Sequence, residues 1–246
     1  MDSTIVICCI LAIGAMCEAI RLNQGYGHAR PLFLHDHPGA RPININPDLC
    51  TPEVAPLGCW RVPNEADTMN IEIFKNQTSG TELTLLWILD GIGYYRENIL
   101  NAYHSQLRWT LHDDDSVTVG FKYREGKEPG APCRKVELEG NLTRGDHAII
   151  DLDLTFPEPL GHMTPRYWLM SDHPDDYVLL FSCINPAQVQ DRVCYGRWYA
   201  EVFVTSDPPD HPPMHLIVEE LYRKLGLTLD NPGFRFINTG HACPEE

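Results

Sequence analysis

The chain has 246 residues, 43% of them hydrophobic, and a formal net charge of −15 at pH 7. Such a chain can hold one large or two small domains, and its apolar content is enough for a sizeable core. The negative charge argues against binding to nucleic acid, whose phosphates would repel it, and against anchoring on anionic lipid.

Residues 4–16 form a long apolar run, and Cys17-Glu18-Ala19 follows with small residues at the −3 and −1 positions of a cleavage site. A run of about thirteen residues is too short to span a bilayer comfortably. We therefore predict that residues 1–19 are a signal peptide and that the protein is secreted to the extracellular space with no stable membrane anchor. A single N-terminal membrane anchor is the alternative.

Cleavage would remove three of the nine cysteines. An even number then remains in a secreted chain, which predicts up to three disulfides, although spacing alone cannot choose among the possible pairings. Two sequons predict glycosylation at Asn76 and Asn141. The remaining cysteines are Cys50, Cys59, Cys133, Cys183, Cys194 and Cys243.

Residues 20–64 are rich in Pro, Gly, Asn, His and Arg and show no sustained period. This composition predicts an extended N-terminal arm, pinned at Cys50 and Cys59, ahead of a folded domain at 65–246. The arm carries three histidines, but no partner cluster with fixed spacing accompanies them, so we expect loop residues and no metal site. These histidines are His28, His35 and His37.

From residue 69 onward, alternating apolar and polar residues predict a series of strands joined by short turns. The alternation begins at 70–74, and Asp113-Asp-Asp115 is expected to be a solvated turn. Further apolar runs lie at 82–89, 103–111, 117–123, 136–138, 148–154 and 196–204.

Residues 166–183 hold two apolar runs joined by a polar turn, which predicts a β-hairpin. Both faces of the second run, 177–183, are apolar. Such a strand needs cover on both sides, as a wall between a filled interior and a helix would have.

One segment has a helical period, with apolar residues at Ile217, Val218, Leu221, Tyr222 and Leu225 and Gly226 at its end. Residues 234–237 offer a short closing strand. The pattern predicts an all-β fold, an eight-stranded antiparallel up-and-down barrel with one C-terminal α-helix packed outside. A sandwich is the alternative, but it would need Greek-key crossovers that the short turns disfavour.

Two stretches carry a family resemblance. Tyr167-Trp-Leu-Met-Ser-Asp172 and Asp176-Tyr-Val-Leu-Leu-Phe-Ser-Cys183 resemble the central block of the lipocalins, and Leu138–Thr143 and Ala242-Cys-Pro244 are similar to apolipoprotein D-like members. The chain is also similar to the lipocalin domain of violaxanthin de-epoxidase, at 175–178, 195–196, 215–225 and 236–246.

The chain departs from the lipocalin pattern at its first strand. The Gly-x-Trp motif is expected there, and Trp87 is the favoured match although no glycine precedes it; Gly58-Cys-Trp60 is the alternative. The arginine that usually packs over this tryptophan is missing, because 204–207 reads Val-Thr-Ser-Asp. We therefore expect that end of the barrel to be closed differently.

The resemblance implies disulfide pairings and an apolar ligand such as a pigment, retinoid, sterol or fatty acid. Cys133 would pair with Cys243, Cys183 with Cys50 or Cys59, and Cys194 with the arm cysteine that remains. The alternation picks nine candidate lining residues, which would equally fill a solid core, and a slip of one residue would turn them all outward. They are Leu107, Trp109, Phe121, Tyr123, Leu138, Leu152, Trp168, Met170 and Phe203.

De-epoxidase activity would need an acidic residue on the second strand, where this chain has His104-Ser-Gln106. We find no other catalytic motif and expect no enzyme, metal or cofactor. The sequence thus favours a secreted carrier of a small hydrophobic molecule. A de-epoxidase-like enzyme and a ligand-free extracellular interaction module are the alternatives, and the oligomeric state stays open.

Overall fold

The computed structural model describes residues 48–50, 58–90, 102–143, 146–155, 162–205, 212–229, 231, 234–236 and 242–244. The chain divides into two compact units, Met1–Leu32 and Phe33–Glu246, and every described residue lies in the second. The predicted signal peptide, the three arm histidines and most of the predicted arm therefore lie outside the described residues.

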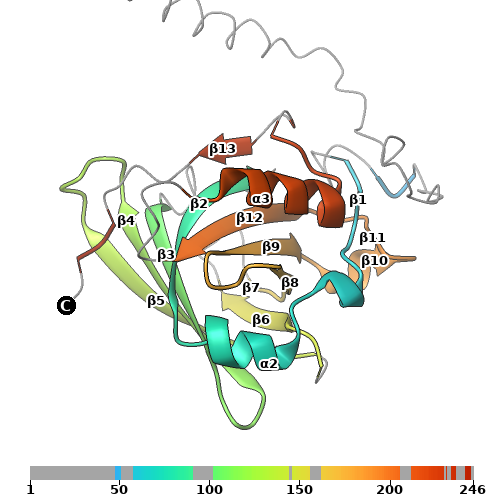
Figure 1. Cartoon of the computed structure of the whole chain (residues 1–246), viewed down its shortest axis with the longest axis horizontal. Coiled ribbons are helices and arrows are strands. Elements are labelled where there is room, and N and C mark those ends of the chain that lie inside the picture. The colour runs from blue at the N-terminus through green and yellow to red at the C-terminus, as the bar shows by residue number, and fades with distance from the viewer. Residues whose placement is uncertain are drawn as a thin grey trace, which may run out of the picture. The chain divides into compact units, whose positions relative to one another are not determined.

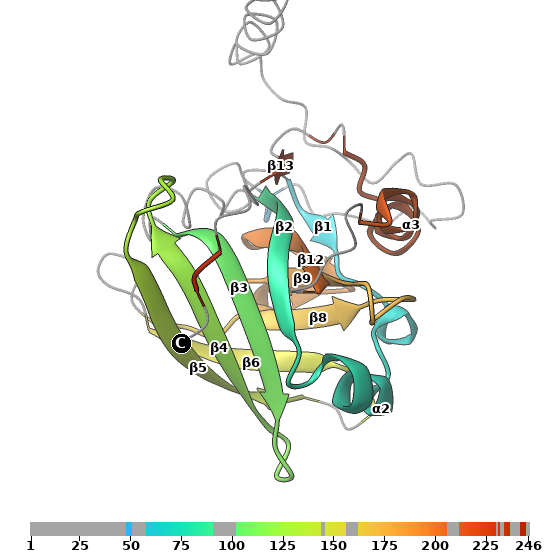
Figure 2. The ribbon, with the colours of Figure 1, turned by 60° about the vertical axis from the view of Figure 1, so that its left-hand side comes forward.

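Eight strands form a closed antiparallel barrel (Figures 1 and 2). Each strand pairs with the next one along the barrel, and the last returns to the first, with Tyr199–Thr205 paired against Leu83–Asp90. Closure removes both sheet edges, as an up-and-down barrel does, so the predicted architecture is confirmed. The strands are β2 (Glu82–Asp90), β3 (Ala102–Leu111), β4 (Ser116–Glu125), β5 (Cys133–Leu142), β6 (Ile149–Thr155), β8 (Arg166–Met170), β9 (Tyr177–Cys183) and β12 (Trp198–Thr205).

Short strands extend the barrel at its margins. β7 (His162–Met163) pairs with the end of β6, and β13 (Phe234–Phe236) pairs with Trp87–Leu89 of β2. β13 is the closing strand expected at 234–237.

A helix covers the end of the barrel at which β2 begins (Figure 2). It consists of α2 (Ile71–Ile73) and a π-helical continuation, η3 (Phe74–Thr78), and the Asn70 side chain caps it by accepting the Glu72 N–H at 2.8 Å. Ile71, Phe74 and Thr78 are buried, an i, i+3, i+7 face that covers the barrel end. The strand expected at 70–74 is therefore wrong. Because the arginine that usually packs at this end is missing, a different closure was expected here, and Phe74 provides it.

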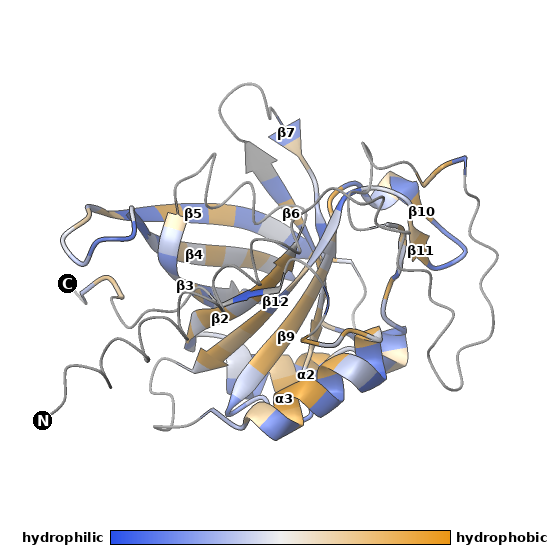
Figure 3. Ribbon diagram, turned by 90° about the horizontal axis from the view of Figure 1, so that it is seen from above, coloured by the Kyte–Doolittle hydropathy of each residue, from blue (hydrophilic) through white to orange (hydrophobic). Residues whose placement is uncertain are grey.

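The second helix packs on the outside of the barrel over β9 and β12 (Figures 1 and 3). It runs through α3 (Met214–Glu220) and η6 (Leu221–Leu225) and ends at Gly226 in the left-handed conformation, φ 67°. Its buried Ile217, Leu221 and Leu225 lie in one cluster with the outward side chains of β9. All seven residues of β9 are buried, so the two-sided wall predicted for 177–183 is confirmed.

A separate three-stranded sheet lies beside the barrel. It is formed by β1 (Trp60–Arg61), β10 (Val189–Gln190) and β11 (Val193–Cys194), with the 3-10 turns η2 (Glu65–Asp67) and η5 (Pro186–Gln188) nearby in sequence. Trp60 packs against Trp198, with the two rings tilted and their centroids 5.1 Å apart, and it donates its indole N–H to the Leu225 carbonyl at 2.8 Å. Trp60 thus belongs to this outer sheet, whereas Trp87 lies on the first barrel strand, as favoured.

Three disulfides join Cys50–Cys59, Cys133–Cys243 and Cys183–Cys194. The expected pairing of Cys133 with Cys243 is present, but the pairings of Cys183 and Cys194 with the arm are wrong. Cys183 ends β9 and Cys194 ends β11, eleven residues later, and the intervening β10–β11 hairpin folds back so that their Cα atoms lie 5.9 Å apart. None of the helices among the described residues is long and apolar enough to cross a membrane.

Candidate ligand site inside the barrel

Two apolar clusters separate the inside of the barrel from its outside. The inner cluster contains Phe74 and the inward side chains of the strands, and the outer cluster contains the α3 face and the outward side chains of β8, β9 and β12. Seven of the nine predicted lining residues belong to the inner cluster or pack against it: Leu107, Trp109, Phe121, Tyr123, Leu138, Leu152 and Phe203.

Trp168 and Met170 were placed on the wrong face. Both lie in the outer cluster, and their neighbours Tyr167 and Leu169 point into the barrel instead. A slip of one residue exchanges the two faces of a strand, and here hydropathy could not choose, because the outer face of β8 is also covered. Trp168 packs there against Phe181, with ring centroids 5.8 Å apart.

The inner surface is unevenly covered. On β9 and β12 the inward apolar side chains are fully buried, whereas on β5 the inward Val136 is 38% exposed and Leu138 is only partly buried. Among the described residues, β5 pairs with β6 over Glu139–Leu142, and Val136 lies outside this ladder. In Figure 3, which shows hydropathy, most of β9 is hydrophobic, whereas hydrophobic and hydrophilic residues alternate along β5.

The opposite wall carries a polar layer that sequence analysis did not predict. Ser182 is the register partner of both Tyr167 on β8 and Tyr199 on β12, and the Tyr199 hydroxyl donates a hydrogen bond to the Tyr167 hydroxyl. Trp109 reaches this layer from β3 and meets the Tyr167 ring edge-on at a centroid distance of 5.9 Å. We call Trp109, Tyr167, Ser182 and Tyr199 the polar layer.

Two members of the polar layer have buried polar atoms without a partner. Within the described part of the chain, neither the Trp109 indole N–H nor the Ser182 hydroxyl makes a hydrogen bond. Trp109 is 1% exposed and Ser182 is completely buried. Buried polar groups are nearly always hydrogen-bonded in folded proteins, so these two atoms call for a partner.

A carboxyl group also lies inside the barrel. Glu201 is 1% exposed and follows Tyr199 on the inward side of β12, with Leu180 and Ile88 as its cross-strand partners. The sequence did not point to this acid, because a single charge inside an apolar strand is easily assigned to the solvent face. The acid that de-epoxidase activity would need was expected at 104–106. Gln106 instead donates to the Glu82 carboxylate at 2.7 Å.

The far end of the inner wall of β4 and β5 carries a charged pair. Arg134 is the register partner of Tyr123, and its Nε lies 2.9 Å from Glu125 Oε1. Burial, followed by the nearby Glu125 charge, raises the pKa of Tyr123. The charge of Arg134 is therefore already balanced within the protein.

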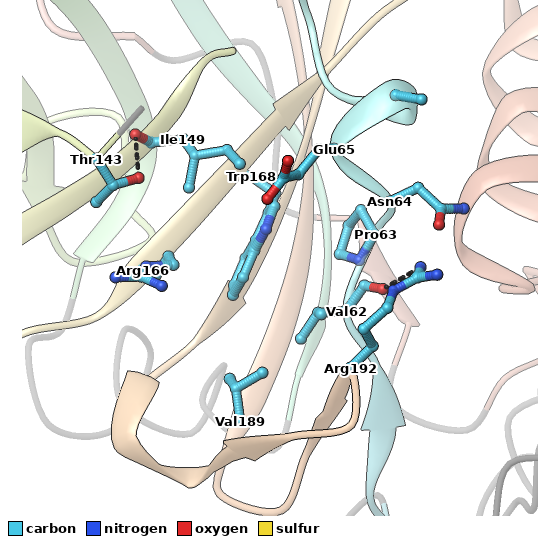
Figure 4. Close-up of a pocket in the computed structure, with 11 residues that line it drawn as sticks. Val62, Pro63, Asn64, Glu65, Thr143, Ile149, Arg166, Trp168, Val189 and Arg192 are labelled. Carbon is cyan, nitrogen blue, oxygen red and sulfur yellow. Dashed lines mark hydrogen bonds between the residues drawn. The ribbon is translucent and has the colours of Figure 1, made fainter. Parts of the chain in front are cut away.

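A second candidate site is a cleft of about 470 Å³ on the outside of the barrel (Figure 4). Trp168 lies in the middle of its lining, with Ile149 and Arg166 to one side and Val62 to the other. The Arg166 guanidinium makes two hydrogen bonds to Asp151, at 2.7 and 2.8 Å, which raise its pKa. Glu65 and Arg192 also line the cleft, so it carries charges of both signs.

Another cleft, of about 480 Å³, lies at the β8–β9 turn and is lined by Ile73, Gln77 and residues 171–176. Of the predicted lining residues, only Trp168 borders either outer cleft. Within the described ranges, no group of three or more His, Cys, Asp or Glu side chains is arranged to hold a metal ion.

Comparisons with known proteins add little to this geometry. No family model matches the chain, and no curated protein matches it. Among solved structures it is similar to the siderocalin Ex-FABP, which is described as functioning through dual ligand specificities; the TM-score is 0.42, the identity 12%, and the match covers 69% of this chain and 95% of that one. A likeness this distant carries no argument about ligands. The strand pairing itself shows an eight-stranded up-and-down barrel with an outer C-terminal helix, the architecture that lipocalins share.

Proposed function

We propose that the protein is a secreted carrier that binds a small hydrophobic molecule inside its barrel. The observation that carries this proposal is the apolar inner face of β5, where Val136, the register partner of the inward Phe121, is 38% exposed and Leu138 is only partly buried. An apolar ligand placed against this wall would be stabilised by about 25 cal/mol for each Å² of apolar surface removed from water. Barrels of eight strands are wide enough to hold one small ligand.

Secretion is supported by the predicted signal peptide and by the three disulfides, which persist in oxidising compartments. Both predicted glycosylation sites, Asn76 and Asn141, are exposed, so a glycan could be accommodated at either. Neither nucleic acid nor a membrane is needed as a partner in this proposal.

The test uses the full chain secreted from a eukaryotic host and N-phenyl-1-naphthylamine, a neutral probe that fluoresces in apolar surroundings. We expect saturable binding, displacement by hydrophobic ligands, and weakening by about tenfold in Val136→Glu, which places a charge on the inner wall. Lys135→Glu adds the same side chain to the neighbouring outward position and should leave the probe Kd within about twofold. Absence of saturable probe binding, or equal weakening in the two variants, would contradict the proposal.

Glu201 favours a second candidate function, an enzyme that acts on an apolar substrate with this buried carboxyl as its proton donor or acceptor. Mass spectrometry of a ligand recovered after prolonged incubation separates the two functions. A carrier returns the ligand unchanged, whereas an enzyme returns a product that Glu201→Gln no longer forms.

A further inference from the structure

We propose that the ligand of the barrel carries a neutral oxygen, a hydroxyl or a carbonyl, which hydrogen-bonds at the polar layer. The barrel should therefore prefer such a ligand to the carboxylate built on the same hydrocarbon. This inference rests on the proposed carrier function and specifies the chemical class of its ligand.

The polar layer places two unpartnered groups around one aromatic ring. The side chains of directly opposed strand residues lie about 5 Å apart at their Cβ atoms, so the Ser182 hydroxyl lies beside Tyr167. Trp109 meets the same Tyr167 ring edge-on at 5.9 Å, and Tyr199 meets it at 6.0 Å. One polar end of a ligand that reached Tyr167 would be near both groups.

Both groups need a partner that the described part of the chain does not supply. Burying a hydroxyl or an indole N–H without a hydrogen bond is unfavourable, and Ser182 and Trp109 are 0% and 1% exposed. The Tyr167 and Tyr199 hydroxyls bond each other. A ligand oxygen or a water molecule would satisfy the two groups that remain.

The chemistry of the layer selects a neutral oxygen. An indole N–H can only donate, and a serine hydroxyl can donate or accept, so together they suit an alcohol or a carbonyl. The described inward residues of β8, β9 and β12 include no lysine or arginine, and Glu201 is the next inward residue after Tyr199. A carboxylate would thus enter a buried layer without a cation and beside a carboxyl group, which is unfavourable.

The first experiment compares matched ligands on the secreted full chain at neutral pH. Retinol is compared with retinoic acid, and hexadecan-1-ol with hexadecanoic acid, each by displacement of N-phenyl-1-naphthylamine. We expect each alcohol to bind at least about tenfold more tightly than its acid, a difference of about 1.4 kcal/mol. Equal affinities, or tighter binding of the acids, would overturn the inference.

The second experiment tests the layer itself with Ser182→Ala. This variant should bind the alcohols about tenfold more weakly, whereas the affinity for the acids and for the probe, which has no oxygen, should stay within about twofold. An unchanged alcohol affinity would mean that the layer holds water only, and the inference would be wrong. Probe binding distinguishes failure of this inference from failure of the carrier function. If the unaltered protein does not bind the probe at all, the carrier function is rejected as well.

Discussion

Tyr177 joins the barrel wall to its outer helix. Its buried hydroxyl donates to Glu220 Oε2 at 2.5 Å, and the same carboxylate accepts the Asp172 N–H and pairs with Lys224 at 2.7 Å. Because a hydrogen bond to a buried charge is worth about 1.5–3 kcal/mol, we expect Tyr177→Phe to lower the free energy of unfolding by about that amount. Urea denaturation measures this loss, and an unchanged urea midpoint would contradict the prediction.

The same tyrosine should make stability fall at high pH. Burial, followed by the hydrogen bond to Glu220, raises the pKa of Tyr177 far above its ordinary value. The unfolded chain loses this proton near pH 10 while the folded protein keeps it, so the contribution to stability is complete below that pH and declines above it. Tyr177→Phe should show a shallower alkaline decline in urea midpoint than the unaltered protein; identical slopes would show that Tyr177 ionises normally.

At the residue scale, the sequence predicted which residues share one face of a strand better than it predicted which face points into the barrel. Leu107, Trp109 and Phe121 were placed correctly because their strands alternate apolar and polar residues. Trp168 and Met170 were not, since both faces of β8 are apolar and the register depends on contacts with other strands. Ser182 was treated as part of an apolar run, and only its partners Tyr167 and Tyr199 reveal its setting.

Among the elements, β5 pairs with β6 over a shorter ladder than with β4, and Gly140 permits the close approach of β5 to β6. A Cβ atom at Gly140 would lie 2.5 Å from the Asp151 carbonyl oxygen and 2.5 Å from a Leu152 methyl group, so Gly140→Ala must push the strands apart. We expect a loss of about 1–3 kcal/mol in unfolding free energy. At Gly120 on β4 the nearest atom would be 3.9 Å away, so Gly120→Ala should be close to neutral in the same urea titration.

Element types were predictable where one periodicity dominated. The helix at 214–225 and the hairpin at 166–183 follow from apolar spacing, and both ended near the residues that the pattern marked. Residues 70–74 fit two templates, because Asn-Ile-Glu-Ile-Phe alternates while Ile71, Phe74 and Thr78 also share one helix face. The helix is formed rather than the strand because it covers the open end of the barrel and buries Phe74 completely.

For the whole molecule, closure of the barrel followed from the number of strands and their short turns, but the disulfides did not follow from spacing. Cys183 and Cys194 are joined because the β10–β11 hairpin returns the chain to β9. No local sequence pattern predicts this return. Cys133–Cys243 was expected only from the family resemblance.

The Cys133–Cys243 disulfide ties the end of the chain to the partly open wall of the barrel. Arg124 on β4 also donates to the Ala242 carbonyl at 3.0 Å, so the segment 242–244 lies against this wall. In the chain-entropy model, the separation of 110 residues gives a stabilisation of about 5 kcal/mol, against about 3 kcal/mol for the nine-residue separation of Cys50 and Cys59. The double variant Cys133→Ala/Cys243→Ala should therefore lose more stability than Cys50→Ala/Cys59→Ala in urea titrations without reductant. Equal losses would show that contacts made by the C-terminal segment, and not loop closure, set its contribution to the fold.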